Sequence, residues 1–191
     1  MSLGRNEMDI EIQIALLGIL GTLGGTILGW VLNSLSQKGK LHVYISSWKE
    51  SFTYNKDGRM LSSTSIDQTQ CYDYKISIDL YNSSGETKIM RDISIVFANN
   101  KNVLFKSTPK DNETKQVKYR IAYFDEITPL NIPAKSVINL NLHDGVWNDD
   151  ASTFFIWKTN RVYFTYKDER NRIKRVPIKK EAYIDYFKNH K

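Results

Sequence analysis

The sequence predicts a mainly β protein: an antiparallel two-sheet sandwich of immunoglobulin-like architecture, preceded by one N-terminal transmembrane α-helix. Two observations lead to this fold class. Residues 14–32 carry no charge, and from residue 41 onward short segments alternate apolar with polar side chains. No strand-like segment is followed by an amphipathic helix of about 10–15 residues, which argues against a parallel βαβ sheet.

The uncharged run has the length of a membrane span. As an α-helix, residues 14–32 would be roughly 28 Å long, close to the roughly 30 Å hydrocarbon core of a bilayer. A cleaved secretory signal is one alternative, but signals begin with basic residues and this N-terminus carries Glu7, Asp9 and Glu11. A buried globular helix is the other, and such a helix seldom runs so long without a polar face. We therefore expect a single-pass membrane protein.

The chain divides into three expected parts: a short tail over residues 1–12, a transmembrane helix over residues 13–36 and one domain over residues 37–191. The last part holds 26 Lys and Arg against 18 Asp and Glu, so it is basic. With 41% hydrophobic and 25% charged residues overall, the composition is that of a globular chain. The single cysteine, Cys71, rules out an internal disulfide and favours a reducing compartment.

Charges beside the span predict its orientation. Arg5 alone precedes it, whereas Lys38, Lys40 and Lys49 follow it. Because positive residues accumulate on the cytoplasmic side of membrane helices, we expect the C-terminal domain in the cytoplasm.

Four glycines are spaced so that they share one face of the expected helix: Gly18, Gly21, Gly25 and Gly29. Small residues at such spacing let two helix backbones approach closely in lipid. The pattern predicts self-association or packing against a partner transmembrane helix. The alternative is that glycine is simply frequent in transmembrane helices.

The clearest strand covers residues 72–80, where Tyr72, Tyr74, Ile76, Ile78 and Leu80 fall on one face. A turn at residues 82–85 leads to a second strand over 89–97, and Asn99-Asn100 predicts a hairpin. We expect further strands at residues 119–124, 137–142, 153–157, 161–167 and 172–178. Eight or nine short strands of this kind favour a sandwich.

Four segments are less regular. Residues 56–70 and 107–118 are polar and are expected to be surface loops. In residues 172–178, Ile173 cannot share a face with Val176 and Ile178 unless the strand contains a bulge. Residues 180–188 have the spacing of a short helix, with an edge strand as the alternative.

No motif in the sequence predicts catalysis, a metal site or a cofactor. His42, His143 and His190 lack metal-binding spacing, and Cys71 has no cysteine partner, so it is expected to be a small packing residue. His143 and Asp144 are adjacent, which places them on opposite faces of a strand. We therefore expect a protein that is not an enzyme.

A basic segment covers residues 158–180. Its expected anion-binding residues are Arg161, Lys167, Arg170, Arg172, Lys174, Arg175, Lys179 and Lys180. Three interpretations stay open. Membrane lipid is the expected partner, because the domain is already at the bilayer. Nucleic acid stacked on nearby aromatic rings is a less favoured one, and protection of an edge strand from sheet-to-sheet association is the third.

Trp147 lies between expected strands. An exposed tryptophan there is a candidate contact for a protein partner, although we favour a role in plugging the end of the sandwich. Together these features predict a membrane-tethered binding or scaffolding module. The alternatives are an accessory subunit of a membrane complex for transport, secretion or defence, and an enzyme without a recognisable motif.

Overall fold

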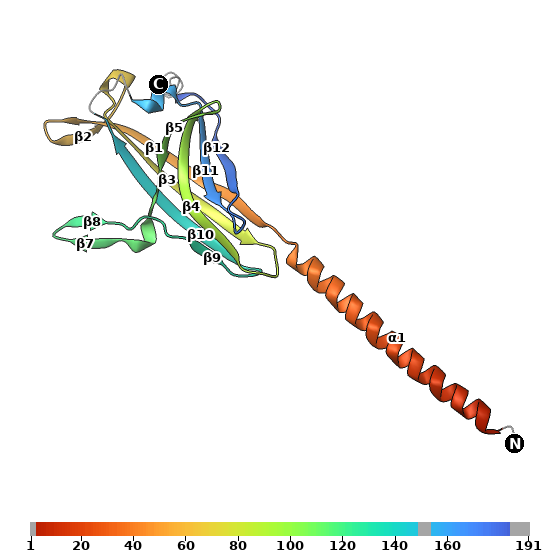
Figure 1. The fold of residues 1–191 in the computed structure, drawn as a ribbon. Helices are drawn as coiled ribbons and strands as arrows, with labels where there is room; N and C mark the ends of the chain where they lie inside the picture. Colours follow the sequence, from red (N-terminus) through yellow and green to blue (C-terminus); the bar gives the residue numbers. More distant parts are fainter. Residues whose placement is uncertain (1–2, 149–153, 184–191) are drawn as a thin grey trace.

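The structure, a computed structural model, describes residues 3–148 and 154–183, with side chains from residue 10 onward. A long helix projects from one end of a β-sandwich (Figure 1). The main elements are α1 (Leu3–Gln37), β1 (Leu41–Lys56), β2 (Arg59–Ser62), β3 (Cys71–Asn82), β4 (Lys88–Asn99), β5 (Asn102–Ser107), β6 (Lys110–Asp111), β7 (Gln116–Lys118), β8 (Ile121–Tyr123), β9 (Leu130–Ile132), β10 (Val137–Trp147), β11 (Arg161–Lys167) and β12 (Ile173–Lys179). Short 3-10 helices cover Ile66–Gln68, Asn112–Thr114 and Phe155–Lys158.

The helix is longer than the sequence predicts. It begins at Leu3, not at residue 13, so the expected tail is part of α1. Residues 5–12 contain neither proline nor glycine, and nothing in them ends a helix. Within α1, the 28 residues Ile10–Gln37 are apolar enough and long enough to cross a membrane, and none of them is buried against the sandwich.

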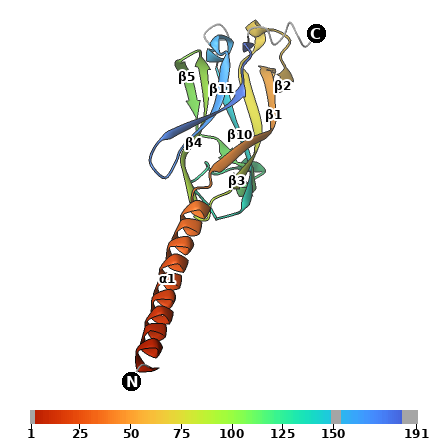
Figure 2. The ribbon, with the colours of Figure 1, turned by 90° about the vertical axis from the view of Figure 1, so that its right-hand side faces the viewer.

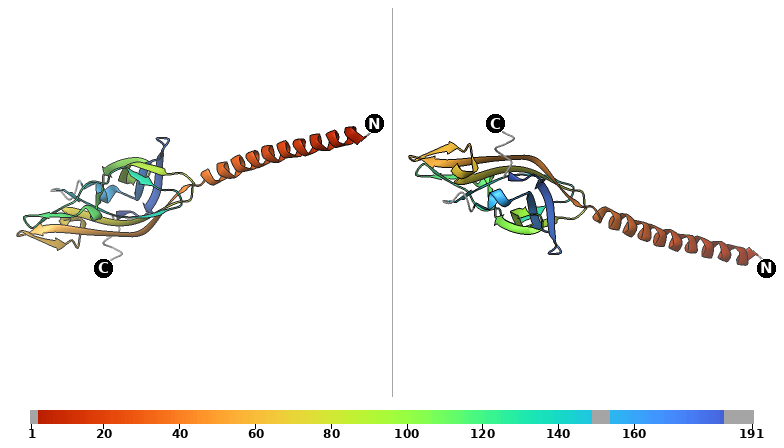
Figure 3. Two further views of the ribbon diagram at one scale, coloured as in Figure 1. Left: turned by 90° about the horizontal axis from the view of Figure 1, so that it is seen from below. Right: turned by 90° about the horizontal axis from the view of Figure 1, so that it is seen from above.

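Two five-stranded antiparallel sheets pack face to face (Figure 2). The first has the order β2-β1-β3-β10-β6, and the second has the order β12-β11-β4-β5 with β9 paired to β4. The helix leaves from one end of this sandwich in every view (Figure 3). We call this end, which also carries the β3–β4 and β11–β12 turns, the junction end, and the opposite end the distal end.

The core confirms the predicted alternation. Tyr72, Tyr74, Ile76, Ile78 and Leu80 of β3 are all at most 1% exposed. They pack against side chains of β4 and β11 from the facing sheet, in one continuous hydrophobic cluster. Alternation in the central strands therefore fixes which side of each sheet faces inward.

The edge strand β12 contains a bulge, but at a different place from the one that the apolar residues suggested. Val162 pairs with Lys179 and Tyr163 with Pro177, so Ile178 has no opposite residue on β11. This bulge does not bring Ile173 to the face of the other two apolar residues: Val176 and Ile178 pack against the core, while Ile173 stays exposed on the opposite face.

Both segments expected to be loops contain regular structure. In residues 56–70, β2 folds back on β1 through a turn at Asp57 and Gly58, which both have positive φ. Residues 107–118 supply β6 and β7, and β7 pairs with β8 in a separate two-stranded hairpin. These strands are only two to four residues long, too short for an alternation pattern to reveal.

The prediction of a strand at residues 153–157 was wrong for its described part. Phe155–Lys158 forms a 3-10 helix in which Ile156 and Trp157 are buried. A run of aromatic residues fits either a strand or a buried helical turn, and packing decides between them. Most of residues 180–188 lies outside the described residues, but Tyr183 is fully buried.

Candidate functional site: a basic cavity at the junction of helix and sandwich

The helix is fastened to the sandwich by the turn between β3 and β4. The backbone N–H of Gly85 donates to the carbonyl of Ser36 (3.0 Å), which satisfies a carbonyl in the last turn of α1. Lys40 donates its N–H to the Ser83 hydroxyl (2.9 Å), and Ser83 donates its own N–H to the Lys40 carbonyl (3.0 Å). The connection between helix and domain is therefore a set of specific contacts and not a free linker.

One glycine makes this approach possible. A Cβ at Gly39 would overlap the carbonyl of Ser83 and the α-carbon of Ser84, so only glycine fits. The turn itself is held by Asn82, which is fully buried. Its amide donates to the carbonyls of Ile132 and Glu86 and its oxygen accepts from Ser84, so the turn is fixed before it meets the helix.

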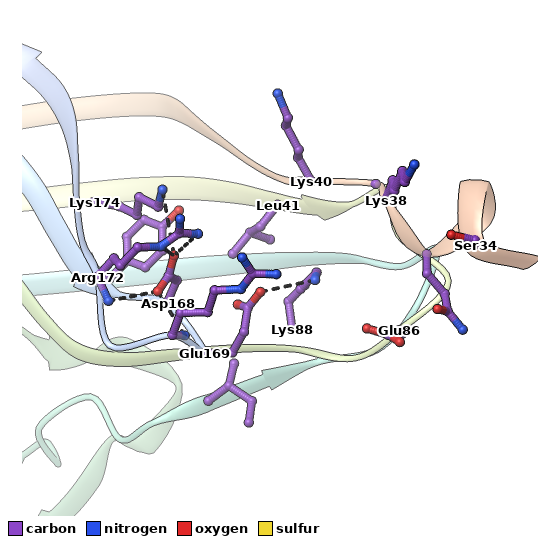
Figure 4. A pocket seen from close by; sticks show the side chains of 15 residues that line it. Ser34, Lys38, Lys40, Leu41, Glu86, Lys88, Asp168, Glu169, Arg172 and Lys174 are labelled. Carbon is purple, nitrogen blue, oxygen red and sulfur yellow. Dashed lines mark hydrogen bonds and ion pairs between the residues drawn. The ribbon is translucent and has the colours of Figure 1, made fainter.

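A cavity of about 680 Å³ lies between the end of α1 and the β11–β12 turn. It is lined by Ser34, Gln37, Lys38, Gly39, Lys40, Leu41, Glu86, Lys88, Ile89, Tyr166, Asp168, Glu169, Arg170, Arg172 and Lys174. Six of these are cationic and three are acidic, which leaves the cavity positive. Figure 4 shows Lys38 and Lys40 on the helix side and Arg172 and Lys174 on the opposite side.

Asp168 organises the wall formed by the β11–β12 turn. Its carboxylate accepts hydrogen bonds from the backbone N–H of Arg170 (3.0 Å) and of Arg172 (2.9 Å), and from the Arg172 guanidinium (3.0 Å from Nε). Burial opposes its ionisation, but these donors outweigh burial and lower the pKa of Asp168. The ionised carboxylate holds the Arg172 side chain in one orientation.

The remaining charges fall into two groups. Lys88 pairs with Glu169 (3.2 Å), and Lys174 lies 3.7 Å from Asp168. Lys38, Lys40 and Arg170 line the same cavity and make no ion pair with any residue that the structure describes. The unneutralised charge therefore sits where the helix meets the sandwich.

Comparison with known proteins places the sandwich in a family. Residues 39–179 match the YopI Ig-like domain model, which covers the sandwich almost completely. The chain belongs to the YopI Ig-like domain family. It is 28% identical over 162 residues to the SPbeta prophage-derived uncharacterized protein YopI of Bacillus subtilis (strain 168), covering 83% of this chain and 90% of that protein.

Solved structures resemble the YopI-family chain only weakly. The YcdA protein of Bacillus subtilis has a TM-score of 0.39 and 13% identity, and the match covers 76% of this chain but only 39% of YcdA. The Iho670 flagellar-like filament has a TM-score of 0.35 and 9% identity, with 89% of this chain and 98% of that chain covered. The family thus fixes the immunoglobulin-like fold and leaves the function to be argued from the site.

The predicted basic residues of this YopI-family domain are spread along the β11–β12 hairpin. Of the eight, only Arg170, Arg172 and Lys174 line the junction cavity. Lys167 instead pairs with Asp92 (2.7 Å), while Arg175 lies farther along β12. The other three, Arg161, Lys179 and Lys180, lie toward the distal end.

Sequence reasoning missed the other half of the cavity. From the sequence, Lys38 and Lys40 indicate only the orientation of the expected span, and no pattern points to Lys88. The position of Lys38 and Lys40 directly after the expected span was the signal that could have placed them near the site. Nothing in the sequence places Lys88 beside residues 168–174, because that proximity depends on the pairing of β4 with β11.

The glycine face of α1 contacts no other part of the chain that the structure describes. Nothing lies within 4 Å of a Cβ built at Gly18, Gly21, Gly25 or Gly29. Thr22 donates its hydroxyl to the Gly18 carbonyl (2.8 Å), so this polar group is satisfied within the helix. The stripe is open to another helix.

Trp147 does not plug the end of the sandwich, contrary to expectation. It is the last residue of β10 and is 47% exposed. Trp157 covers the core instead, stacked on Phe52 with ring centroids 5.4 Å apart. The 3-10 helix at Phe155–Lys158 turns the Trp157 ring inward. The strand expected at residues 153–157 did not indicate this.

Three titratable groups outside the cavity, Cys71, His143 and Asp144, lie on the neighbouring strands β3 and β10. Burial, together with the Asp73 carboxylate, raises the pKa of the Cys71 thiol to about 11, so the thiol is protonated at neutral pH. His143 packs edge-on against Phe124, while Asp144 on the other face accepts from Ser107 (2.5 Å). Among the described residues, no group of three His, Cys, Asp or Glu is placed to hold a metal ion.

A buried polar network closes the distal end. The Glu50 carboxylate accepts from the hydroxyl of Tyr183 (2.7 Å) and from Trp48 Nε1 (3.0 Å), and it pairs with Lys179 (2.5 Å). The Tyr72 hydroxyl lies 3.0 Å from that of Tyr183. Burial raises the pKa of both phenols, which stay protonated, and the network ties the chain after β12 to β1.

Proposed function

We propose that this YopI-family chain is a membrane-anchored binding module without enzymatic activity. Its immunoglobulin-like domain is held against the bilayer surface by α1. The observation that carries the proposal is the combination of a 28-residue apolar helix with a junction that fixes it to the sandwich. A signal sequence that is cleaved off has no need of close contact with the domain that follows it. Gly39 provides such contact, because only glycine fits against Ser83 and Ser84.

The domain lies on the cytoplasmic side in this proposal. Lys38 and Lys40 follow the span directly, in the position where positive residues are retained inside. The anchor associates with a second copy through the open glycine face, because close packing of helix backbones is a main source of affinity in lipid. Association of the helices would place two or more sandwiches side by side at the membrane surface, an arrangement suited to scaffolding.

The anchoring proposal is tested by extracting membranes of expressing cells with alkaline carbonate. The full chain is expected to remain in the pellet. A Leu20→Arg/Leu23→Arg variant is expected to move to the soluble fraction, because each Arg at the centre of a span costs about 2.5–3.5 kcal/mol. Ile173→Arg makes the same change at an exposed apolar residue of the sandwich and should stay in the pellet. Carbonate-soluble wild-type chain would refute the anchor.

A second candidate function is an accessory subunit of a multi-protein membrane complex. The observation that favours it is the β7–β8 hairpin, which projects from the sandwich (Figure 1). Tyr119 at its tip is 96% exposed, and Val117, Ile121 and Tyr123 are also exposed. Exposed aromatic residues of this kind are enriched at protein interfaces.

This candidate is tested by photo-crosslinking in living cells from an amino acid placed at Tyr119. A discrete adduct larger than a dimer of the chain is expected, with none from the exposed polar position Lys101 at the distal end. Absence of any adduct from Tyr119, or equal adducts from both positions, would exclude a partner at the hairpin.

A further inference from the structure

We propose that the junction cavity binds the phosphate of an anionic lipid headgroup. The inference rests on the proposed membrane anchoring, and it adds a ligand and a site to it. It differs from general attraction of a basic domain to a charged surface, because it assigns one site with defined walls. Three separate parts of the chain supply those walls: the end of α1, the start of β4 and the β11–β12 turn.

The cavity lies at the depth of the headgroups. The continuous apolar run ends at Leu32, and the helical rise from there to Gln37 is roughly 7–8 Å. The polar layer of a bilayer is roughly 5–8 Å thick on each side. Gln37, Lys38 and Lys40, which line the cavity, therefore lie in or just outside that layer when α1 spans the membrane.

The charges are arranged to receive an anion. Asp168 and Glu169 neutralise part of the positive charge, but Lys38, Lys40 and Arg170 have no acidic partner among the residues described. The Arg172 side chain is held by Asp168 and is still 58% exposed, so N–H groups remain to face a ligand. A fixed guanidinium with neighbouring ammonium groups matches the oxygens of a phosphate ester.

The size and the remaining lining suit the same ligand. A volume of about 680 Å³ lies within the ordinary range for small-molecule sites. Leu41 and Ile89 add apolar surface to an otherwise polar lining, as a glycerol backbone leading into acyl chains requires. Protection of an edge strand does not explain the site, because Lys38, Lys40 and Lys88 do not belong to the edge strand β12.

The test is native mass spectrometry of the full chain in detergent with added phosphatidylglycerol or phosphatidylcholine. We expect one phosphatidylglycerol to bind at least about tenfold more tightly than phosphatidylcholine. In Lys40→Gln/Arg170→Gln this preference should disappear. Both side chains are exposed, and only their backbone groups hold the junction, so the variant keeps the fold.

The matched control is Lys101→Gln/Lys158→Gln, which removes two exposed charges from the distal end. It should keep the full preference for phosphatidylglycerol. Equal binding of the two lipids by the wild-type chain would overturn the proposal. Equal losses in the two double variants would also overturn it, because net charge alone would then explain the binding.

Soluble phosphates separate the two sources of this ligand chemistry. Glycerol phosphate or inorganic phosphate, added at the concentration of the lipid, should leave phosphatidylglycerol bound. Displacement at that concentration would assign the cavity to a free phosphate compound and overturn the lipid proposal. The carbonate extraction tests the membrane anchoring independently of this site. If the chain were carbonate-soluble and still bound phosphatidylglycerol selectively, the anchoring proposal would be refuted and the lipid site would be supported.

Discussion

Gly39 lies against Ser83 so closely that a side chain at residue 39 would overlap the Ser83 carbonyl oxygen. This relationship joins the apolar helix to the sandwich in one orientation. Because this orientation places the end of α1 along one side of the junction cavity, the contact connects the helix with the proposed ligand site.

Gly39→Ala is expected to lower the stability of the domain by about 1–3 kcal/mol, since backbone atoms must move to admit the methyl group. The measurement is thermal unfolding of the full chain in detergent, followed by near-ultraviolet circular dichroism. Gly85→Ala is the matched control: its Cβ would lie 3.1 Å from the Ser36 hydroxyl, which can rotate, so its effect should be smaller. A larger loss at Gly85 would contradict the account of the junction.

Tyr183→Phe is expected to lower the free energy of unfolding by about 1–3 kcal/mol, because the largely buried Glu50 carboxylate loses a hydrogen-bond donor. Chemical denaturation of the full chain gives the free energy of unfolding. Tyr163→Phe removes a hydroxyl that accepts only a long bond of 3.4 Å from Arg161, and it should change stability little. Equal effects of the two changes would show that the distal network does not stabilise the domain.

Asp168→Asn is expected to destabilise the β11–β12 turn at neutral pH by about 1.5–3 kcal/mol, because the amide accepts its charged and backbone donors less strongly. The folded-state pKa of Asp168 is depressed. Its contribution is therefore complete above the unfolded value of about 3.9 and is lost as the pH falls through the lower folded value.

The difference in unfolding free energy between Asp168→Asn and wild type should accordingly be constant from pH 7 to about pH 5 and shrink below about pH 4. Denaturant unfolding at several pH values measures it. The exposed residue Asp57, changed to Asn, serves as the control and should show little difference at any pH. A difference for Asp168→Asn that grows on acidification would contradict the assigned role.

Gly25→Ile is expected to weaken self-association of the chain about tenfold, because a branched side chain separates helix backbones that small residues bring together. Sedimentation equilibrium in detergent measures the dissociation constant. Leu23→Ile changes a residue on the opposite face of α1 and should leave the constant unchanged. A chain that is monomeric to begin with would refute association through the glycine face.

The sequence predicted the elements whose pattern is local and long. Alternation over residues 72–80 identifies a strand because one face of β3 is buried and the other is not. The apolar run identifies α1 because it is long and uncharged.

Features that depend on packing between distant residues could not be predicted. Either Trp147 or Trp157 was able to cover the distal core, and only the 3-10 helix at Phe155–Lys158 decides for Trp157. The cavity requires Lys88 beside the β11–β12 turn, a proximity created by pairing of strands far apart in sequence. The sequence shows the cationic residues of the cavity, but it does not show that they lie close together in the fold.

The most direct test of the central claim, that α1 spans a membrane and holds the sandwich at one face of it, is thiol labelling in intact cells. Asn6→Cys and Lys101→Cys are made separately in a Cys71→Ser background and treated with a membrane-impermeant reagent. The account predicts labelling at residue 6 in intact cells, and labelling at residue 101 only after lysis. The same accessibility at both positions in intact cells would contradict it, because the two residues would then lie on one side of the membrane.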